Sequence, residues 1–182
     1  MRMTAPEERS MSLAEWLVLC LVCEQPRHGF AIARLVGAEG SMGQVWRVPK
    51  PVVYRALQRL EQVGLVRTAE RQSSSQGPVR SLIEVTPAGR EAAAGWLTRP
   101  VSHTRDVRSE LLVKLALLDR AGTDPQPLLE AQREYLAPVA DALRDRLHSA
   151  DGFERTLAMW RYETASATVR FLDALRAQPS VR

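Results

Sequence analysis

Two arginines and a glutamine in the segment Tyr54-Arg-Ala-Leu-Gln-Arg59 are residue types that read the edges of nucleic-acid bases. Arg55 and Arg59 are four residues apart, so a helix would place both guanidinium groups on one face. A guanidinium fork bonds O6 and N7 of guanine together, and the amide of Gln58 can pair with the edge of adenine. The same spacing is typical of a solvated helix face that pairs only with its own neighbours, and these residues alone leave both interpretations open.

Positive charge gathers around this segment. The chain carries 25 Lys and Arg against 21 Asp and Glu, and residues 47–80 hold seven of the basic residues with two acidic ones. A basic surface of this kind favours a polyanion as partner. Tyr54 and Lys50 could bond phosphate oxygens, whereas Val52 in the same turn has no donor for a phosphate. We therefore predict an interface with double-stranded DNA that comprises Arg47, Lys50, Val52, Tyr54, Arg55, Gln58, Arg59, Arg71 and Arg80.

The elements that must position these side chains follow from their start and stop residues. Ser12 and Glu15 form a capping box ahead of an apolar helix, Gly64 ends the helix that carries the arginines, and Thr86 with Pro87 starts a further helix. We expect helices at residues 13–23, 28–39, 51–62 and 87–98, and two hairpin strands at residues 65–69 and 79–85. This order predicts a winged helix-turn-helix domain over residues 10–99, whose third helix enters the major groove. The expected fold is mostly α with a small β-wing, an α+β class.

The second half of the chain has the pattern of helices only. Residues 100–105 contain a proline and form the expected linker, and residues 106–178 form the expected helical region. In the helix expected at residues 151–177, apolar side chains recur every three or four residues, which is close to a heptad stripe. The stripe predicts a homodimer that places two reading helices about one DNA turn apart on a near-palindromic operator, although packing within the same helical region gives the same pattern. Its members are Phe153, Leu157, Trp160, Thr164, Phe171 and Leu175.

Several blocks of the sequence resemble the PadR family of transcriptional regulators. They are His28-Gly-Phe30, Tyr54-Arg-Ala-Leu-Gln-Arg-Leu-Glu-Gln-Val-Gly-Leu-Val66 and Thr86-Pro-Ala-Gly-Arg90, followed by residues 104–115, which look like that family's entry into its C-terminal helices. The resemblance implies the long form of the family, a homodimeric DNA-binding regulator with a C-terminal helical dimerisation region. It also implies a repressor that is released by a small, often aromatic, ligand. The chain departs from the family at Val52, where a hydroxyl side chain is usual, and at Ile83, which stands in place of a tyrosine.

A small-molecule effector would need a cavity with apolar and aromatic walls. The candidate pocket residues are Trp16, Trp96, Trp160 and Tyr162. Large aromatic side chains also dominate cores and interfaces, so ordinary packing of these four residues remains an alternative.

Other classes of function find less support in the residues. Cys20 and Cys23 lie inside an apolar run, which is typical of core packing and not of a redox pair. The three histidines are scattered, without metal-ligand spacing or a paired nucleophile, so we expect no enzyme and neither a metal nor another cofactor. No apolar run is long enough for a membrane helix, and residues 1–10 lack the pattern of a secretion signal, so we expect a cytoplasmic protein with no membrane partner.

Two alternative interpretations remain open. The first is a winged-helix module that binds protein without specific DNA binding, in which Val52 weakens the DNA-facing surface. The second is another winged-helix family such as MarR, which would place dimerising helices at both ends of the chain.

Overall fold

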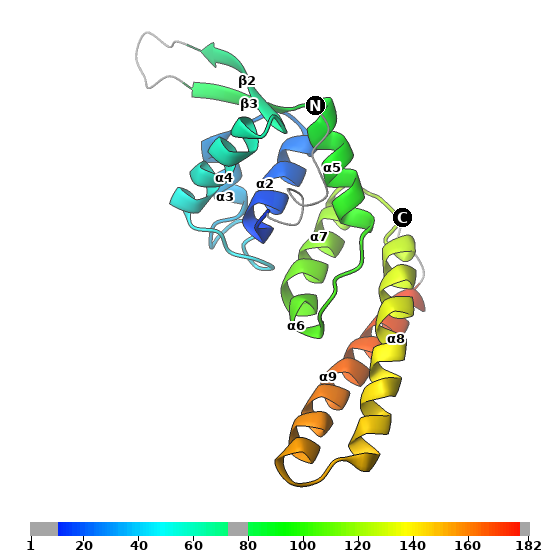
Figure 1. The fold of residues 1–182 in the computed structure, drawn as a ribbon. Coiled ribbons are helices and arrows are strands. Elements are labelled where there is room, and N and C mark those ends of the chain that lie inside the picture. The colour runs from blue at the N-terminus through cyan, green and yellow to red at the C-terminus, as the bar shows by residue number, and fades with distance from the viewer. Residues whose placement is uncertain (1–10, 73–79, 179–182) are drawn as a thin grey trace. The chain divides into compact units, whose positions relative to one another are not determined.

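The computed structural model describes residues 11–72 and 80–178, which separate into two compact units, residues 1–97 and 98–182. The described elements are mostly helices, with one small antiparallel sheet in the first unit (Figure 1). The predicted fold class, mostly α with a small β-wing, is therefore confirmed. Among the described residues, the structure contains no helix long and apolar enough to cross a membrane.

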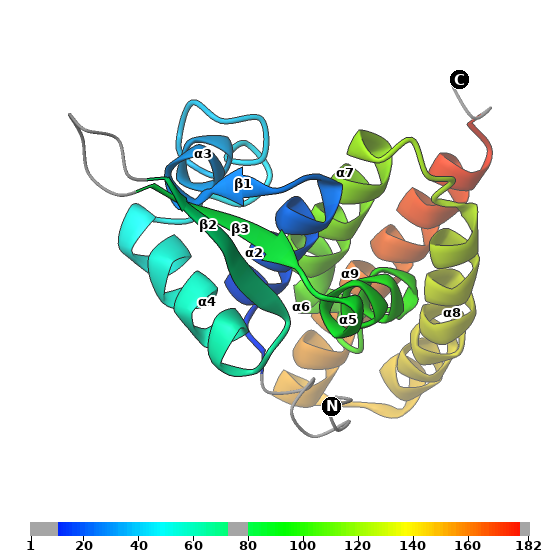
Figure 2. The ribbon, with the colours of Figure 1, turned by 90° about the horizontal axis from the view of Figure 1, so that it is seen from above.

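Helix α2 (Leu13–Glu24) forms the centre of the first unit. The predicted capping box is present: the Ser12 hydroxyl accepts from the backbone N–H of Glu15, and the Glu15 carboxylate accepts from the backbone N–H of Ser12. Every residue from Trp16 to Val22 is buried, because helix α4 (Lys50–Gln62) packs on this helix and strand β3 (Arg80–Val85) crosses it (Figure 2). This all-round burial explains why the helix is apolar on every side.

The sheet has three strands, where the sequence predicts two. Strands β2 (Val66–Gln72) and β3 (Arg80–Val85) form the expected antiparallel hairpin, with an irregularity in register between Thr68 and Glu70. A two-residue strand, β1 (Arg27–His28), pairs with the other edge of β3, which gives the order β1-β3-β2. Two residues cannot show the alternation by which strands are recognised, so the sequence holds no signal for β1.

Helix α3 (Gly29–Leu35) is shorter than the expected helix over residues 28–39. It ends at Val36, and residues 37–45 form turns in which the backbone N–H of Met42 reaches back to the carbonyl of Leu35. Three glycines in these turns supply the tight backbone approaches, and buried Met42 holds the loop to the core. The apolar residues of this stretch thus pack in a loop and not in a longer helix.

Helix α4 (Lys50–Gln62) has Pro49 as its N-cap residue and Val63 as its C-cap residue, and the predicted glycine, Gly64, follows directly. Gly64 has φ +74°, its N–H donates to the carbonyl of Glu61, and the N–H of Leu65 donates to the carbonyl of Leu60. This pair of bonds is a Schellman motif, which leads the chain directly from α4 into β2.

A threonine ties this turn to the next helix, α5 (Pro87–Thr98). The Thr86 hydroxyl lies 2.7 Å from the carbonyl oxygen of Gly64, to which it donates, and it accepts from the N–H of Gly89. The N–H of Thr86 also donates to the carbonyl of Leu65. The end of α4 and the start of α5 are therefore fixed to one another.

The second unit begins with a segment held by two buried polar side chains. Gln132 is fully buried; its Oε1 accepts from the N–H of Val101 and its Nε2 donates to the carbonyl of the same residue. The Nζ of buried Lys114 donates to the carbonyl of Arg99 and pairs with Glu110 at 2.7 Å. These contacts fix residues 99–101 to helices α7 (Leu112–Arg120) and α8 (Gln126–Ser149), although the segment itself is neither helix nor strand.

Four helical segments follow this start in the order α6 (Thr104–Asp106), η1 (Val107–Leu111), α7 (Leu112–Arg120) and α8 (Gln126–Ser149), and the chain ends in α9 (Gly152–Arg176). The η1 segment is a single π-helical turn near the start of the expected helical region, residues 106–178. Helices α8 and α9 lie side by side as an antiparallel hairpin (Figure 1). The buried face of α9 consists of Ala158, Ala165, Thr168 and Leu172.

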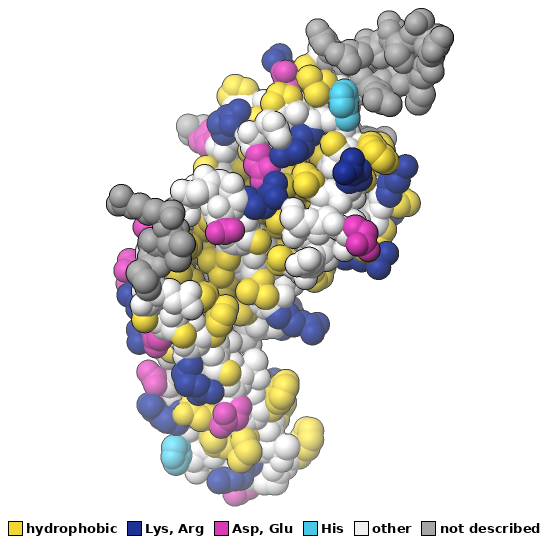
Figure 3. All heavy atoms as spheres, turned by 180° about the vertical axis from the view of Figure 1, so that it is seen from behind, with side chains coloured by type: hydrophobic (Ala, Val, Ile, Leu, Met, Phe, Trp, Pro, Cys, Tyr) yellow, Lys and Arg dark blue, Asp and Glu magenta, His cyan; other side chains and the backbone are white. Residues whose placement is uncertain are grey.

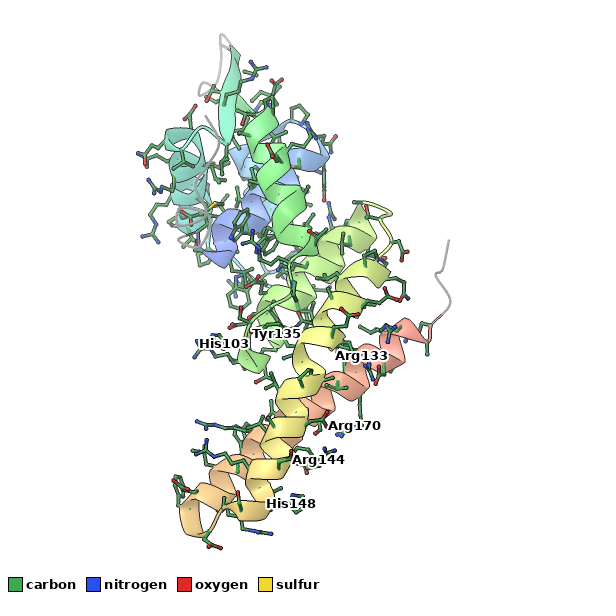
Figure 4. All side chains as sticks on the ribbon, turned by 45° about the vertical axis from the view of Figure 1, so that its right-hand side comes forward. His103, Arg133, Tyr135, Arg144, His148 and Arg170 are labelled. Atoms are coloured by element: carbon green, nitrogen blue, oxygen red, sulfur yellow. The ribbon has the colours of Figure 1, made fainter. Side chains whose placement is uncertain are left out.

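Charged residues line the outside of this hairpin. Arg133 of α8 forms an ion pair with Asp173 of α9, and Arg176 of α9 pairs with Glu130 of α8 at 3.4 Å. Figure 4 shows Arg133, Tyr135, Arg144 and His148 along α8, with Arg170 on α9. The ion pairs lock the register of the two helices at the end near α8's start.

Candidate nucleic-acid interface

Helix α4 divides into a buried and an exposed face. Val53, Leu57 and Leu60 pack into the core, while Arg55, Gln58 and Arg59 are exposed. Neither arginine forms an ion pair within the part of the chain that the structure describes. The two guanidinium groups and the amide are thus free to bond an outside partner from one side of the helix.

The start of α4 places further predicted residues beside this face. Lys50 is exposed, and its Nζ lies 5.6 Å from the centre of the Phe30 ring, a cation–π contact that limits where the ammonium can go. Arg47 is exposed in the loop before α4, and Val52 is half-buried in its first turn. The structure therefore brings the basic residues together while it turns Val52 partly inward.

Tyr54 is partly exposed and also packs against a neighbouring element. Its side chain is 44% exposed, yet its ring lies against the start of α3, where a Cβ added to Gly29 would be 3.1 Å from Cε1 of Tyr54 and from Cδ1 of Leu57. The glycine of the His-Gly-Phe block thus allows this close approach without a shift of its neighbours. Tyr54 thus keeps part of its surface in contact with solvent.

The wing carries the remaining predicted residues. The backbones of Arg71 and Arg80 are paired across the hairpin, Arg71 with Ser81 and Arg80 with Gln72, but their side chains lie outside the described residues. Arg67, a basic residue of the same hairpin, is ion-paired with Glu84 at 2.9 Å. This pairing distinguishes it from the arginines of α4.

A groove of about 730 Å³ lies between α4, the start of α3 and strands β2 and β3. Phe30, Tyr54, Glu61, Thr68 and Ile83 are among the side chains that line it. Sequence reasoning missed this groove, because its walls come from four segments that only the fold brings together. The sole sequence signal was Ile83, a residue smaller than the tyrosine usual at that place.

Part of the first unit matches a known protein family. Residues 18–95, which extend from α2 into α5, match the model of the transcriptional regulator PadR-like family. The match covers most of the first unit, which is similar to a PadR-like domain and is called the PadR-like domain below. No curated protein matches the chain.

Solved structures that the chain resembles include three structures of two Bacillus regulators. Bacillus subtilis PadR in complex with operator DNA is 17% identical, with a TM-score of 0.46 over 90% of this chain and 97% of that chain. The same protein in complex with p-coumaric acid is 16% identical, with a TM-score of 0.41 over 91% and 94%. The PadR-like transcriptional regulator BC1756 from Bacillus cereus is 17% identical, with a TM-score of 0.42 over 96% and 98%.

The four candidate pocket aromatics occupy two different settings. Within the PadR-like domain, Trp16 and Trp96 are 5% and 3% exposed and stack on each other with their rings 5.4 Å apart. Trp160 and Tyr162 lie on α9 in the second unit, where Trp160 is 70% exposed and Tyr162 is half-buried. The first pair therefore fills the core of the domain, and neither ring lines the groove beside α4.

Trp160 contributes to a second groove, of about 940 Å³, which lies within the second unit between α6, η1, α7 and α9. Phe171, Leu112 and Val107 give it apolar walls, and arginines surround them: Arg105, Arg108, Arg161 and Arg170. This surface was not predicted as a groove, although three of its residues, Trp160, Thr164 and Phe171, belong to the predicted stripe.

The predicted stripe of α9 lies largely on the surface. Phe153 is 80% exposed, Leu157 and Phe171 are also exposed, and Thr164 and Leu175 are half-buried. The buried residues of α9 lie between them and include the small Ala158 and Ala165. The side chains at the surface of the hairpin are accordingly a mixture of hydrophobic and charged residues (Figure 3).

The cysteine pair of the PadR-like domain is part of its core. Cys20 is buried, Cys23 is partly buried, and both are free thiols. Burial raises the pKa of the Cys23 thiol to about 11, an effect that the nearby Arg90 only partly offsets. A thiol that stays protonated near neutral pH is a poor nucleophile, as expected for a packing role.

Proposed function

We propose that this chain is a sequence-specific, double-stranded-DNA-binding regulator of transcription and not an enzyme. One observation carries the proposal: Arg55, Gln58 and Arg59 stand exposed on one face of the third helix of a PadR-like domain, without ion-pair partners among the described residues. In winged helix-turn-helix proteins this helix enters the major groove. Here the two arginines would read guanine and Gln58 would read adenine.

Contacts to the DNA backbone would position the helix. Lys50 and Arg47 supply charge at its start, and the hydroxyl of Tyr54, a partly exposed residue, would donate to a phosphate. Val52 is half-buried and its side chain has no hydrogen-bond donor, so other residues of this turn would make the phosphate contacts. In the proposal, Arg71 and Arg80 of the wing reach phosphates or the adjacent minor groove.

The test is fluorescence anisotropy of the full chain on a labelled duplex from upstream of its own gene, with a scrambled duplex beside it, each at 50 and 200 mM salt. Specific binding predicts a markedly lower Kd for the upstream duplex and a steep salt dependence for both. Weak, salt-independent binding to both duplexes would contradict the proposal. It would favour the alternative, a winged-helix module that binds protein.

The proposed active form is a homodimer that uses the exposed stripe of α9. Phe153, Leu157, Trp160 and Phe171 place a row of large apolar side chains in water, and exposed apolar rows of this size mark interaction sites. The groove beside Trp160 would receive side chains of a second copy. Such a dimer presents two α4 helices to a near-palindromic operator.

The proposal extends to the direction of control. In the proposal, the dimer represses the gene while it is bound to the operator, and a small ligand that lowers its DNA affinity releases the gene. A reporter fused to the upstream region is expected to be silenced when the protein is expressed. A reporter whose activity rises with the protein would identify an activator instead.

A further inference from the structure

Two charged side chains lie beside the exposed stripe of α9, on the same side of it. Glu163 and Arg170 (Figure 4) are exposed, line the groove beside Trp160, and form no ion pair within the part of the chain that the structure describes. They are seven residues apart, which is about two turns of a helix, so both lie on one edge of the stripe. Arg161 lies on the other edge, followed two turns later by buried Thr168. The two edges of the stripe therefore carry different groups.

The part of α9 that lines this groove has large side chains at its ends and small ones between them. Trp160 and Phe171, at the two ends, are 70% and 37% exposed. Thr164 and Ala167 are the small residues between them. In an antiparallel pair with a two-fold axis between residues 165 and 166, Trp160 lies opposite Phe171 of the second copy, and Thr164 lies opposite Ala167. Aromatic rings then pack together at both ends, while the small side chains let the two helices approach in the middle.

Other arrangements of two α9 helices bring like groups together. In a parallel pair each residue meets its own copy, so Trp160 would face Trp160. An antiparallel pair centred on Tyr162 would use the stripe over residues 153–171. Because a two-fold axis pairs each edge of the stripe with the same edge of the second copy, Arg161 would then face Arg161 and Glu163 would face Glu163. Like charges in contact disfavour this register.

The register centred between residues 165 and 166 avoids these conflicts, since Glu163 then lies about 3 Å along the helix axis from Arg170 of the second copy. We propose that α9 pairs antiparallel with α9 of a second copy in this register, and that Glu163 of each copy forms an ion pair with Arg170 of the other. The apolar stripe supplies most of the affinity, and the two ion pairs select the register and an identical partner. The pairing rests on the proposed function, because it uses the exposed stripe of α9 as the dimer surface.

Charge reversal tests the ion pairs on the full chain. Glu163→Arg and Arg170→Glu each convert both ion pairs of the dimer into repulsive pairs. Either variant should therefore raise the dimer dissociation constant at least about tenfold in sedimentation equilibrium at low salt. Glu134→Arg, which reverses an exposed carboxylate of α8 outside the groove, is the matched control. It should leave the dissociation constant within about twofold of the parent value.

Two rescues test which residues meet. With Glu163→Arg and Arg170→Glu combined in one chain, opposite charges face each other again in exchanged places, and the dissociation constant should return to within about threefold of the parent value. An equal mixture of the two single variants should form the mixed dimer in at least about nine-tenths of the dimers, where random pairing gives about half, because only the mixed dimer restores both attractions. Native mass spectrometry separates the mixed dimer from the two homodimers by mass.

The outcomes separate the register from the dimer itself. A dimeric parent whose single variants stay as tight as the control, or whose combined variant and mixture are not rescued, would overturn the register and leave the proposed homodimer supported. A parent chain that stays monomeric at every concentration would contradict the homodimer and the register with it. Thermal melting curves that match the parent show that the single variants are folded. If one of them unfolds, the combined variant decides the matter.

Discussion

Helices α4 and α9 each bury one face and expose another, but the exposed faces differ in chemistry. α4 exposes Arg55, Gln58 and Arg59, which water solvates well. α9 exposes Phe153 and Trp160, and apolar surface in water costs about 25 cal/mol per Å². The face of α4 can therefore wait for a partner, whereas the face of α9 is stabilised by permanent cover. This difference suits a transient DNA contact on one helix and a lasting protein contact on the other.

The largest expected effect comes from placing a charge in the stripe of α9. Trp160→Glu should weaken the dimer by about 3 kcal/mol, roughly a hundredfold in its dissociation constant, because a desolvated aromatic anchor is lost and a carboxylate is buried. Sedimentation equilibrium measures this change. Met159→Glu alters an exposed apolar neighbour outside the stripe and should change the dissociation constant little. Equal losses in the two variants would show that α9 has no defined interface.

The next effect concerns base reading by α4. Arg55→Ala should reduce the discrimination between operator and scrambled duplex by about 2 kcal/mol, since a bidentate contact to guanine is lost. Competition anisotropy with the two duplexes gives the value. Arg67→Ala removes an exposed arginine that is already paired with Glu84, so discrimination should hold in this control. An equal loss in both variants would move the reading residues from α4 to the wing.

A smaller effect is expected at the start of α4. Lys50→Ala should weaken binding to operator and scrambled duplex alike by about 1 kcal/mol and lower the slope of log K against log salt by about one, because phosphate contacts carry no sequence information. A salt titration of both complexes measures the slope. A loss confined to the operator would instead assign Lys50 to a base edge.

The smallest effect is the response of the dimer to salt. Between 50 and 200 mM salt the dimer dissociation constant of the parent protein should change less than about twofold, because burial of apolar surface is little screened, while DNA binding should weaken at least about tenfold. Sedimentation and anisotropy at the same salt concentrations compare the two. A dimer that is as salt-sensitive as the DNA complex would remove the distinction between the two helices.

Periodicity explains why the faces of both helices could be predicted. Val53, Leu57 and Leu60 fix which side of α4 is buried, and the arginines then fall on the other side. In α9 the pattern found the large apolar residues but could not tell which of them pack within the chain. The structure shows that Ala158 and Ala165 are buried, whereas the larger Phe153 and Trp160 are exposed.

Other features escaped the sequence because they depend on distant segments. β1 is too short for a pattern, and the groove beside α4 requires α3, α4 and two strands at once. The expected linker gave no sign that Gln132 and Lys114 would hold its neighbours, because a buried amide or ammonium is indistinguishable in sequence from a solvated one. The partners of Gln132 and Lys114 become evident only when the helices are assembled.

The contact behind α4 has a mechanical consequence. Gly29 brings the start of α3 so close to Tyr54 and Leu57 that one added methyl group would require them to give by a few tenths of an ångström. The packing of the start of α3 against α4 therefore helps to set the distance between α4 and the core of the domain. In the proposed complex, a residue outside the DNA-reading face would thus affect how deeply Arg55 and Arg59 reach into the major groove.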